Sequence, residues 1–123
     1  LDEVTSDLKA LALELSVPLI VLVQRTRFSQ RRDDPVPHID DADTNAIERD
    51  GDVVMAVWRK ETWIRRNKPS PNEPNEAMDK WQADMNRSAG IAEIITLKVR
   101  SGPSHHQRTL RWHGETTTFS ELR

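Results

Sequence analysis

The sequence contains no cysteine, has few aromatic residues and has no long apolar run. Without Cys the chain has neither disulfides nor thiolate metal sites, which fits a reducing compartment, so we expect a cytoplasmic protein. Its apolar stretches all fall short of the roughly 20 residues that span a bilayer, so we expect no membrane partner. Charges throughout the first 15 residues argue against a signal peptide. The net charge of -2 gives no whole-chain argument for nucleic-acid binding, so such a site has to come from local clusters of cations.

The chain has 123 residues, which fits one domain at most, and 31% of them are charged, which leaves room for only a modest core. It starts without Met and in the middle of a helical pattern, so we expect it to be a piece of a larger protein.

The first third of the chain predicts half of a βαβ unit. Apolar residues at helical spacing predict an amphipathic helix over Leu1–Leu15, which Pro18 ends. The unbroken aliphatic run Leu19–Val23 then predicts a strand buried on both faces, as in a parallel sheet. We therefore expect an α/β fold with a mostly parallel sheet and flanking helices.

The rest of the sequence predicts further strands, a surface loop and two helical segments. Buried strands are predicted at Val53–Trp58 and Ile91–Val99, and a closing antiparallel hairpin at 109–112 and 117–120. A surface loop is expected over 28–43, and one helical turn from Thr44 to Arg49. The stretch 60–89 reads as a polar insertion that contains a helix from Asn75 to about Arg87, with Gly90 placed to end it.

Two cations, Lys98 and Arg100, stand at the end of the strand Ile91–Val99, just before Gly102 and Pro103. Side chains two apart on a strand project to the same side, so the two cations should point together. This arrangement suits an anion such as a phosphate, because Arg adds a planar fork of donors to the point charge of Lys. The alternative is a pair of solvated charges at a strand edge.

Several motifs in order resemble the DnaB family of replicative DNA helicases. They are the helix with Leu8-Lys9-Ala10-Leu11-Ala12, the strand Val17-Pro18-Leu19-Ile20-Val21-Leu22, the pair Gln24 and Arg27, the motif Ala46-Ile47-Glu48-Arg49-Asp50-Gly51-Asp52, the strand Ala92-Glu93-Ile94-Ile95 that leads to Lys98-Val99-Arg100-Ser101-Gly102-Pro103, and the closing Phe119-Ser120-Glu121-Leu122. The resemblance implies that residues 1–123 form the carboxy-terminal part of a RecA-like, P-loop NTPase core, with the insertion at about 60–89.

The resemblance also implies a function in trans. Family members form hexameric rings of identical subunits, hydrolyse ATP with Mg²⁺ and move on single-stranded DNA. This sequence has no Gly-x-x-x-x-Gly-Lys-[Ser/Thr] loop and no apolar strand that ends in a Mg²⁺-organising acid. The parent protein is therefore expected to be an ATP-hydrolysing helicase, whereas the chain alone is expected to bind no ATP or Mg²⁺ and to be inactive.

By the same resemblance, Lys98 and Arg100 match cations that reach a neighbouring subunit's γ-phosphate. Gln24 matches a residue that senses this phosphate and passes its state to the DNA-facing loops. Arg27 and Gly102 match positions associated with the nucleotide. For Gln24 the alternative is a polar residue that caps a strand end.

The DNA-facing loop departs from the family pattern, because Ala42 stands in place of an Arg and Asn45 in place of a Gly. Contacts to DNA phosphates, without sequence preference, are then expected from Arg25, Arg31 and Arg32. Asn45 is also included in the candidate DNA surface. A solvated charged loop is the alternative.

No metal site is assigned. Glu48 and Asp50 are expected to hold the DNA loop in place, and Asp52 to cap the start of the next strand. His105 and His106 are adjacent, a poor spacing for two ligands on one metal. A non-enzymatic RecA-like interaction module, or an ATPase remnant, remains the main alternative to a helicase motor, and a RecA-family recombination or partner-loading ATPase is a third reading.

Overall fold

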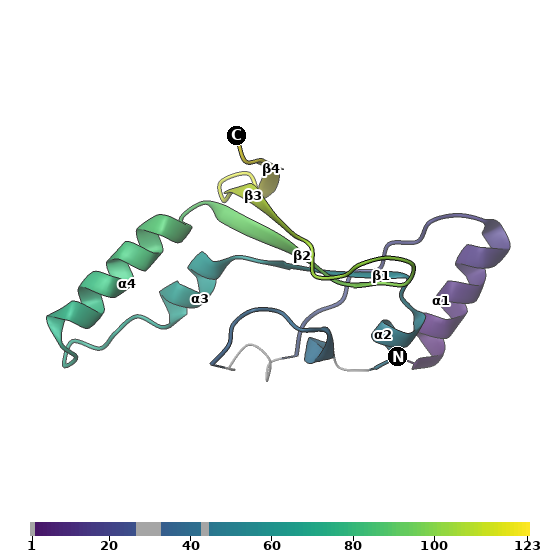
Figure 1. Ribbon diagram of the computed structural model, residues 1–123, viewed down its shortest axis with the longest axis horizontal. Helices are drawn as coiled ribbons and strands as arrows, with labels where there is room; N and C mark the ends of the chain where they lie inside the picture. The colour runs from purple at the N-terminus through teal and green to yellow at the C-terminus, as the bar shows by residue number, and fades with distance from the viewer. Residues whose placement is uncertain (1, 27–32, 43–44) are drawn as a thin grey trace. The chain divides into compact units, whose positions relative to one another are not determined.

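The structure is a computed structural model that describes residues 2–26, 33–42 and 45–123 (Figure 1). The chain divides into two units, the first made of Leu1–Ala56 with Ile95–His106 and the second of Val57–Ile94 with Gln107–Arg123. The helices are α1 (Asp2–Leu15), the short 3-10 helix η2 (Ile39–Asp41), α2 (Ala46–Asp50), α3 (Lys60–Arg66) and α4 (Asn75–Ser88), and the strands are β1 (Val53–Trp58), β2 (Ile91–Val99), β3 (Gln107–His113) and β4 (Thr118–Glu121).

The four strands of the described residues form one antiparallel sheet in the order β1-β2-β3-β4. Each strand therefore pairs with the next one along the chain, and β3 and β4 form the predicted hairpin, with Trp112 opposite Phe119. The expectation of a mostly parallel sheet was wrong for this chain. A parallel pair needs a crossover that returns the chain to the same end of the sheet, whereas sequential neighbours in this sheet run in opposite directions.

The run Leu19–Val23 does not form a strand, so that prediction was also wrong. It belongs to no ladder within the described residues, and Ile20 and Leu22 are 90% and 94% exposed. A strand of this composition is stable only with neighbours on both edges and cover on both faces. The residues described here provide neither.

Strand β1 forms where predicted, but it is not buried on both faces. Exposed and half-buried residues alternate along it, and the exposed ones include Met55, at 61%. This alternation is typical of a strand covered on one face only.

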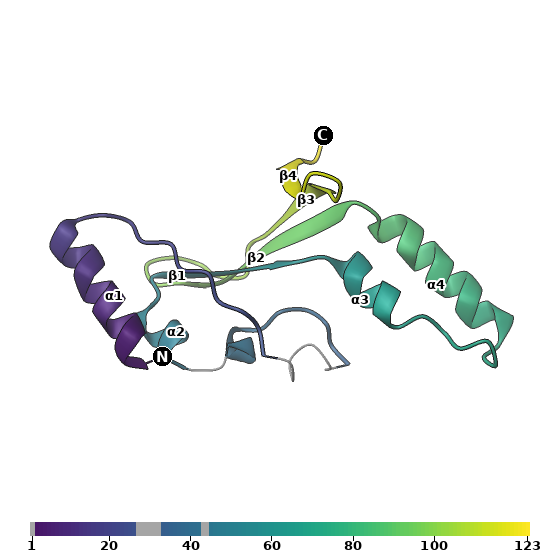
Figure 2. The ribbon, with the colours of Figure 1, turned by 180° about the vertical axis from the view of Figure 1, so that it is seen from behind.

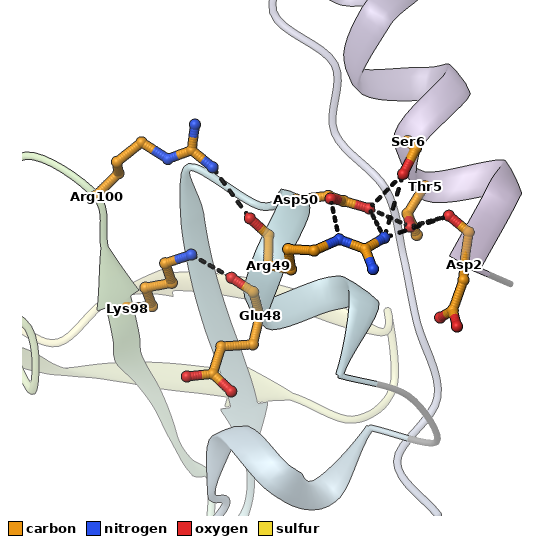
Figure 3. Close-up of polar contacts among 8 residues, drawn as sticks. All are labelled: Asp2, Thr5, Ser6, Glu48, Arg49, Asp50, Lys98 and Arg100. Carbon is orange, nitrogen blue, oxygen red and sulfur yellow. Dashed lines mark hydrogen bonds and ion pairs between the residues drawn. The ribbon is translucent and has the colours of Figure 1, made fainter.

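In the first unit, the predicted amphipathic helix is present as α1, and a polar network attaches it to α2 (Figure 3). The Asp50 carboxylate accepts hydrogen bonds from Thr5 Oγ1 at 2.6 Å and Ser6 Oγ at 3.2 Å, both on α1. Arg49 also donates to both carboxylate oxygens of Asp50, from Nε and Nη2, each at 2.8 Å. The bonds from Arg49 and then Thr5 lower the pKa of Asp50 well below its usual range.

In the second unit, α3 and α4 lie side by side (Figures 1 and 2). The helix α4 is the one predicted inside the polar insertion, whereas α3 was not predicted. The Trp81 indole on α4 donates to the carbonyl oxygen of Ile64 on α3 at 2.8 Å, and Ile64 is 4% exposed. Burial of Ile64 and satisfaction of the indole N–H hold the two helices together.

The chain turns from α4 into β2 at Gly90, which has a φ of 66°. Its N–H donates to Glu61 Oε2 at 3.2 Å, and its carbonyl accepts the backbone N–H of Trp112 at 2.8 Å. Gly90 thus ends α4, as predicted, in the left-handed conformation typical of a helix terminus. Nearby, Trp112 packs against Phe119 and under the Arg59 guanidinium, which lies 4.5 Å from the ring centroid.

Within the residues that the structure describes, no helix combines the length and the apolar character needed to cross a bilayer.

We predict that Gly90→Ala lowers the stability of the second unit by about 1–2 kcal/mol, because a Cβ is disfavoured in the left-handed region. Thermal unfolding followed by circular dichroism measures the effect. Gly114→Ala is the matched control, since Gly114 has no positive φ and a Cβ there would meet only the Trp112 indole nitrogen, at 3.5 Å. Equal melting temperatures for the two variants would contradict the role given to Gly90.

We predict that Asp50→Asn loosens α1, so that its backbone amides exchange with solvent about three- to tenfold faster at neutral pH, as expected for loss of a surface charge network. Because folding lowers the pKa of Asp50, its carboxylate stabilises the position of α1 fully above pH 3.8, the ordinary pKa of an aspartate. This stabilisation is lost progressively as the pH falls below that value. The difference from wild type should therefore narrow in acid. Asp7→Asn, which removes an exposed carboxylate of α1, should leave the exchange rates unchanged. Unaltered α1 exchange in Asp50→Asn would refute the attachment.

Candidate anion site at the end of β2

The candidate site lies in the first unit, where β2 ends beside α2. The backbone N–H of Arg100 donates to the carbonyl oxygen of Asp52 at 2.8 Å, which ties the end of β2 to the residue just before β1. Lys98 and Arg100 leave β2 on the same side, and Figure 3 shows both side chains directed toward α2. The two cations are thus brought together by strand geometry.

Both cations bind the backbone of α2. Lys98 Nζ donates to the carbonyl oxygen of Glu48, and Arg100 Nη2 donates to the carbonyl oxygen of Arg49 at 3.1 Å (Figure 3). These consecutive carbonyls belong to the last turn of the helix, where carbonyl groups lack intrahelical partners and favour positive charge. The cations therefore satisfy the exposed end of α2.

A carboxylate, Asp52, lies next to the pair. Its Oδ1 lies 3.3 Å from Arg100 Nε, and its other oxygen forms an ion pair with Lys9 Nζ of α1. The hydrogen bond from Lys9 lowers the pKa of Asp52, and the charges of Lys9, Arg100 and Lys98 act in the same direction. Asp52 is therefore a carboxylate at neutral pH, surrounded by three cations.

The site is accessible to solvent. The Arg100 side chain is 49% exposed, and Lys98 is half-buried. Their hydrogen-bond acceptors on α2 are neutral carbonyls rather than buried acids. A phosphate can replace such partners without leaving a buried charge unpaired.

Gln24 and Arg25 lie in the irregular segment that follows the run Leu19–Val23. Gln24 is exposed, and the strand that was expected to carry it does not form. The Arg25 guanidinium binds Asp41 Oδ2 through Nε at 3.0 Å and Nη2 at 2.7 Å, and Asp41 is 3% exposed. The N–H of Thr26 also donates to the Asp41 carbonyl at 2.9 Å. The segment after Gln24 is thereby bound to the loop that precedes α2.

Two other predicted site residues, Asn45 and Gly102, lie within the described residues. Asn45 is exposed at the start of α2, where its carbonyl accepts the Arg49 N–H at 3.0 Å. Gly102 lies in the turn after β2 and is exposed. Three predicted residues lie outside the described residues; they are Arg27, Arg31 and Arg32.

Sequence reasoning missed Lys9 and Thr5, and it gave Asp50 and Asp52 only local structural roles. Helical periodicity marks apolar positions, so it gives no signal for polar residues on the same helix. The partners of Lys9 and Thr5 are also 43 and 45 residues away along the chain, a separation at which no local pattern identifies a contact.

Comparisons with known proteins identify the family to which these residues belong. The family model described as "DnaB-like helicase C terminal domain" matches residues 1–121. The replicative DNA helicase DnaB of Rickettsia bellii is 38% identical over 104 residues, which cover 82% of this chain and 21% of the relative. The enzyme of the same name from Haemophilus influenzae is 32% identical over 121 residues, which cover 98% of this chain and 22% of the relative.

Two solved structures are similar over nearly the whole chain. One, described as an ATPase domain, has a TM-score of 0.75 and 27% identity, covering 99% of this chain and 36% of that one. A DnaB-like replicative helicase, described with its interactions with primase, has the same TM-score and identity and covers 99% of this chain and 25% of that one. The chain thus spans about a fifth of the length of the curated relatives. It belongs to the family of DnaB-like helicase C-terminal domains.

Proposed function

We propose that this chain acts in trans within a ring of identical helicase subunits, where Lys98 and Arg100 reach the γ-phosphate of ATP held by the neighbouring subunit. The parent protein is then an ATP-dependent replicative helicase, and the ring is a hexamer as in the family. The whole helicase has the activity, and the chain by itself has none.

The observation that supports this proposal most directly is the convergence of an exposed cation, Arg100, and a half-buried one, Lys98, on neutral acceptors. Lys98 and Arg100 emerge from one strand end and bind the adjacent carbonyls of Glu48 and Arg49. A phosphate carries full negative charge and several acceptor oxygens, so it competes well with two carbonyl dipoles. Hydrogen bonds of exposed cations contribute only about 0–1 kcal/mol each, so releasing them costs little.

Lys98 and Arg100 can bind the negatively charged phosphates of a nucleotide, but they cannot hold the whole nucleotide. The sequence lacks a phosphate-cradling loop, so ATP and Mg²⁺ have to be held by the upstream part of the neighbouring subunit. When bound there, Mg²⁺ neutralises charge on the β- and γ-phosphates. Phosphoryl transfer spreads negative charge over the equatorial oxygens, and cations delivered in trans can accelerate it by roughly 10³–10⁵. Lys98 and Arg100 supply such cations.

The link from Gln24 to the DNA-facing loop runs through Arg25. In this proposal Gln24 responds to the γ-phosphate, and the Arg25–Asp41 ion pair transmits its position to the loop before α2. Because Arg25 is engaged with the buried carboxylate of Asp41, it is not available to bind DNA phosphates in this arrangement. Contacts to single-stranded DNA are then assigned to Arg31, Arg32 and Asn45, through phosphates and without sequence preference. Arg27 and Gly102 remain candidates for positions near the nucleotide.

We predict that Lys98→Ala or Arg100→Ala in the full-length helicase lowers DNA-stimulated ATP hydrolysis at least about 100-fold, while the affinity for ATP changes little. The charge that is removed acts on the transition state, whereas the nucleotide is held by the neighbour. Steady-state hydrolysis and equilibrium binding of a fluorescent ATP analogue measure the two quantities. Arg111→Ala is the matched control, because Arg111 is an exposed strand arginine of the second unit.

Mixed rings test the action in trans. Subunits with Arg100→Ala keep their own phosphate-binding loop, and subunits with a disabled loop keep Arg100, so a ring that contains both should recover part of the activity. Absence of recovery would show that the cations act within their own subunit. Full activity of both alanine variants would favour the alternative of a non-enzymatic interaction module.

A further inference from the structure

We infer that Asp52 is a positioning residue for Arg100: it fixes the guanidinium at the end of β2 so that one edge stays available to a phosphate. This inference rests on the proposed trans function and assigns to Asp52 a role distinct from capping the start of β1.

Arg100 is fixed at both ends of its side chain. Its backbone N–H binds the carbonyl oxygen of Asp52 at 2.8 Å, and its Nε lies 3.3 Å from the carboxylate of the same residue. Beyond Nε, Nη2 donates to the Arg49 carbonyl at 3.1 Å. An exposed arginine normally samples many rotamers, so the backbone bond, the ion pair at Nε and the hydrogen bond at Nη2 together restrict the orientation of the guanidinium.

These contacts leave the far edge of the guanidinium for another ligand. Both N–H groups of Nη1, and the second N–H of Nη2, have no hydrogen-bond partner among the residues that the structure describes. Two parallel donors on one edge are the arrangement that binds two phosphate oxygens at once. The side chain is 49% exposed, so a ligand from another subunit can approach it.

Lys9, on α1, also binds Asp52. Its ammonium forms an ion pair with Asp52 Oδ2, whereas Arg100 Nε is closest to Oδ1. The lowered pKa of Asp52 is consistent with a carboxylate that stays ionised between these cations. The two oxygens therefore have separate partners, and the effect of losing each partner can be measured separately.

Three variants of the full-length helicase test the inference in the absence of nucleotide. The rate at which an arginine-specific dicarbonyl reagent modifies Arg100 is followed by peptide mass spectrometry. Asp52→Asn should speed modification of Arg100 several-fold, because the amide no longer holds the guanidinium electrostatically. Lys9→Met, which keeps the aliphatic stem, should leave the rate near wild type, and Asp7→Asn should leave it unchanged.

The same variants separate positioning from structural support. If Lys9→Met speeds modification as much as Asp52→Asn, then Asp52 acts by anchoring α1, and the inference is overturned. An unchanged rate in Asp52→Asn also overturns it.

Hydrolysis assays give the second readout. Asp52→Asn should lower kcat about tenfold with little change in KM, less than Arg100→Ala, because the cation remains but is no longer oriented. Mixing Asp52→Asn subunits with subunits whose phosphate-binding loop is disabled should restore ATP hydrolysis. If Arg100→Ala is defective but Asp52→Asn has wild-type kcat, the positioning role fails and the trans function stands. If Arg100→Ala itself has wild-type activity, the trans function fails.

Discussion

The contact between the end of β2 and the end of α2 determines the arrangement of the first unit. Lys98 and Arg100 bind the carbonyls of Glu48 and Arg49, and the next residue, Asp50, holds α1 through Thr5 and Ser6. A helix of five residues has little stability of its own. The short helix α2 is therefore maintained by its neighbours, and it in turn sets the direction of both cations.

In this arrangement the candidate nucleotide contacts Lys98 and Arg100 and the candidate DNA contact Asn45 meet at one short helix, α2. Asn45 begins α2, and the cations bind its last turn. The loop before α2 is anchored by Asp41 to Arg25, next to Gln24. A displacement of this loop by DNA would move the carbonyls that hold the cations. Under the proposed function, α2 is therefore a route by which DNA binding and ATP hydrolysis would be coupled without a change in the sheet.

The sequence predicted most of the elements and the β3–β4 hairpin, but not the antiparallel pairing of β1 with β2 and of β2 with β3. The helices α1 and α4 and the strands β1 to β4 lie where periodicity and turn residues placed them. The strand expected at Leu19–Val23 did not form, because an apolar run signals burial without showing what will cover it. The helix α3 was missed because its sequence, with Lys60, Arg65 and Arg66, is mostly charged, and only Trp63 and Ile64 are large apolar residues available for packing.

Only part of the candidate site was predicted from the sequence, because local patterns do not show which distant segments meet. Strand alternation alone places Lys98 and Arg100 on one side, whereas Asp50, Asp52 and Lys9 acquire their roles from contacts between distant segments. Such contacts depend on tertiary packing, which no local pattern encodes.

In the proposed ring, Lys98 leaves the Glu48 carbonyl for a neighbour's nucleotide, and Arg100 presents to it the guanidinium edge that the Arg49 carbonyl does not occupy. A structure of the assembled helicase ring with a transition-state analogue, ADP with a metal fluoride, tests this proposal most directly. We expect Lys98 Nζ and the free edge of Arg100 within hydrogen-bond distance of the fluoride group bound by the adjacent subunit. Lys98 still bound to the Glu48 carbonyl, and no contact between Arg100 and the fluoride group of an occupied, closed nucleotide site, would contradict the proposal.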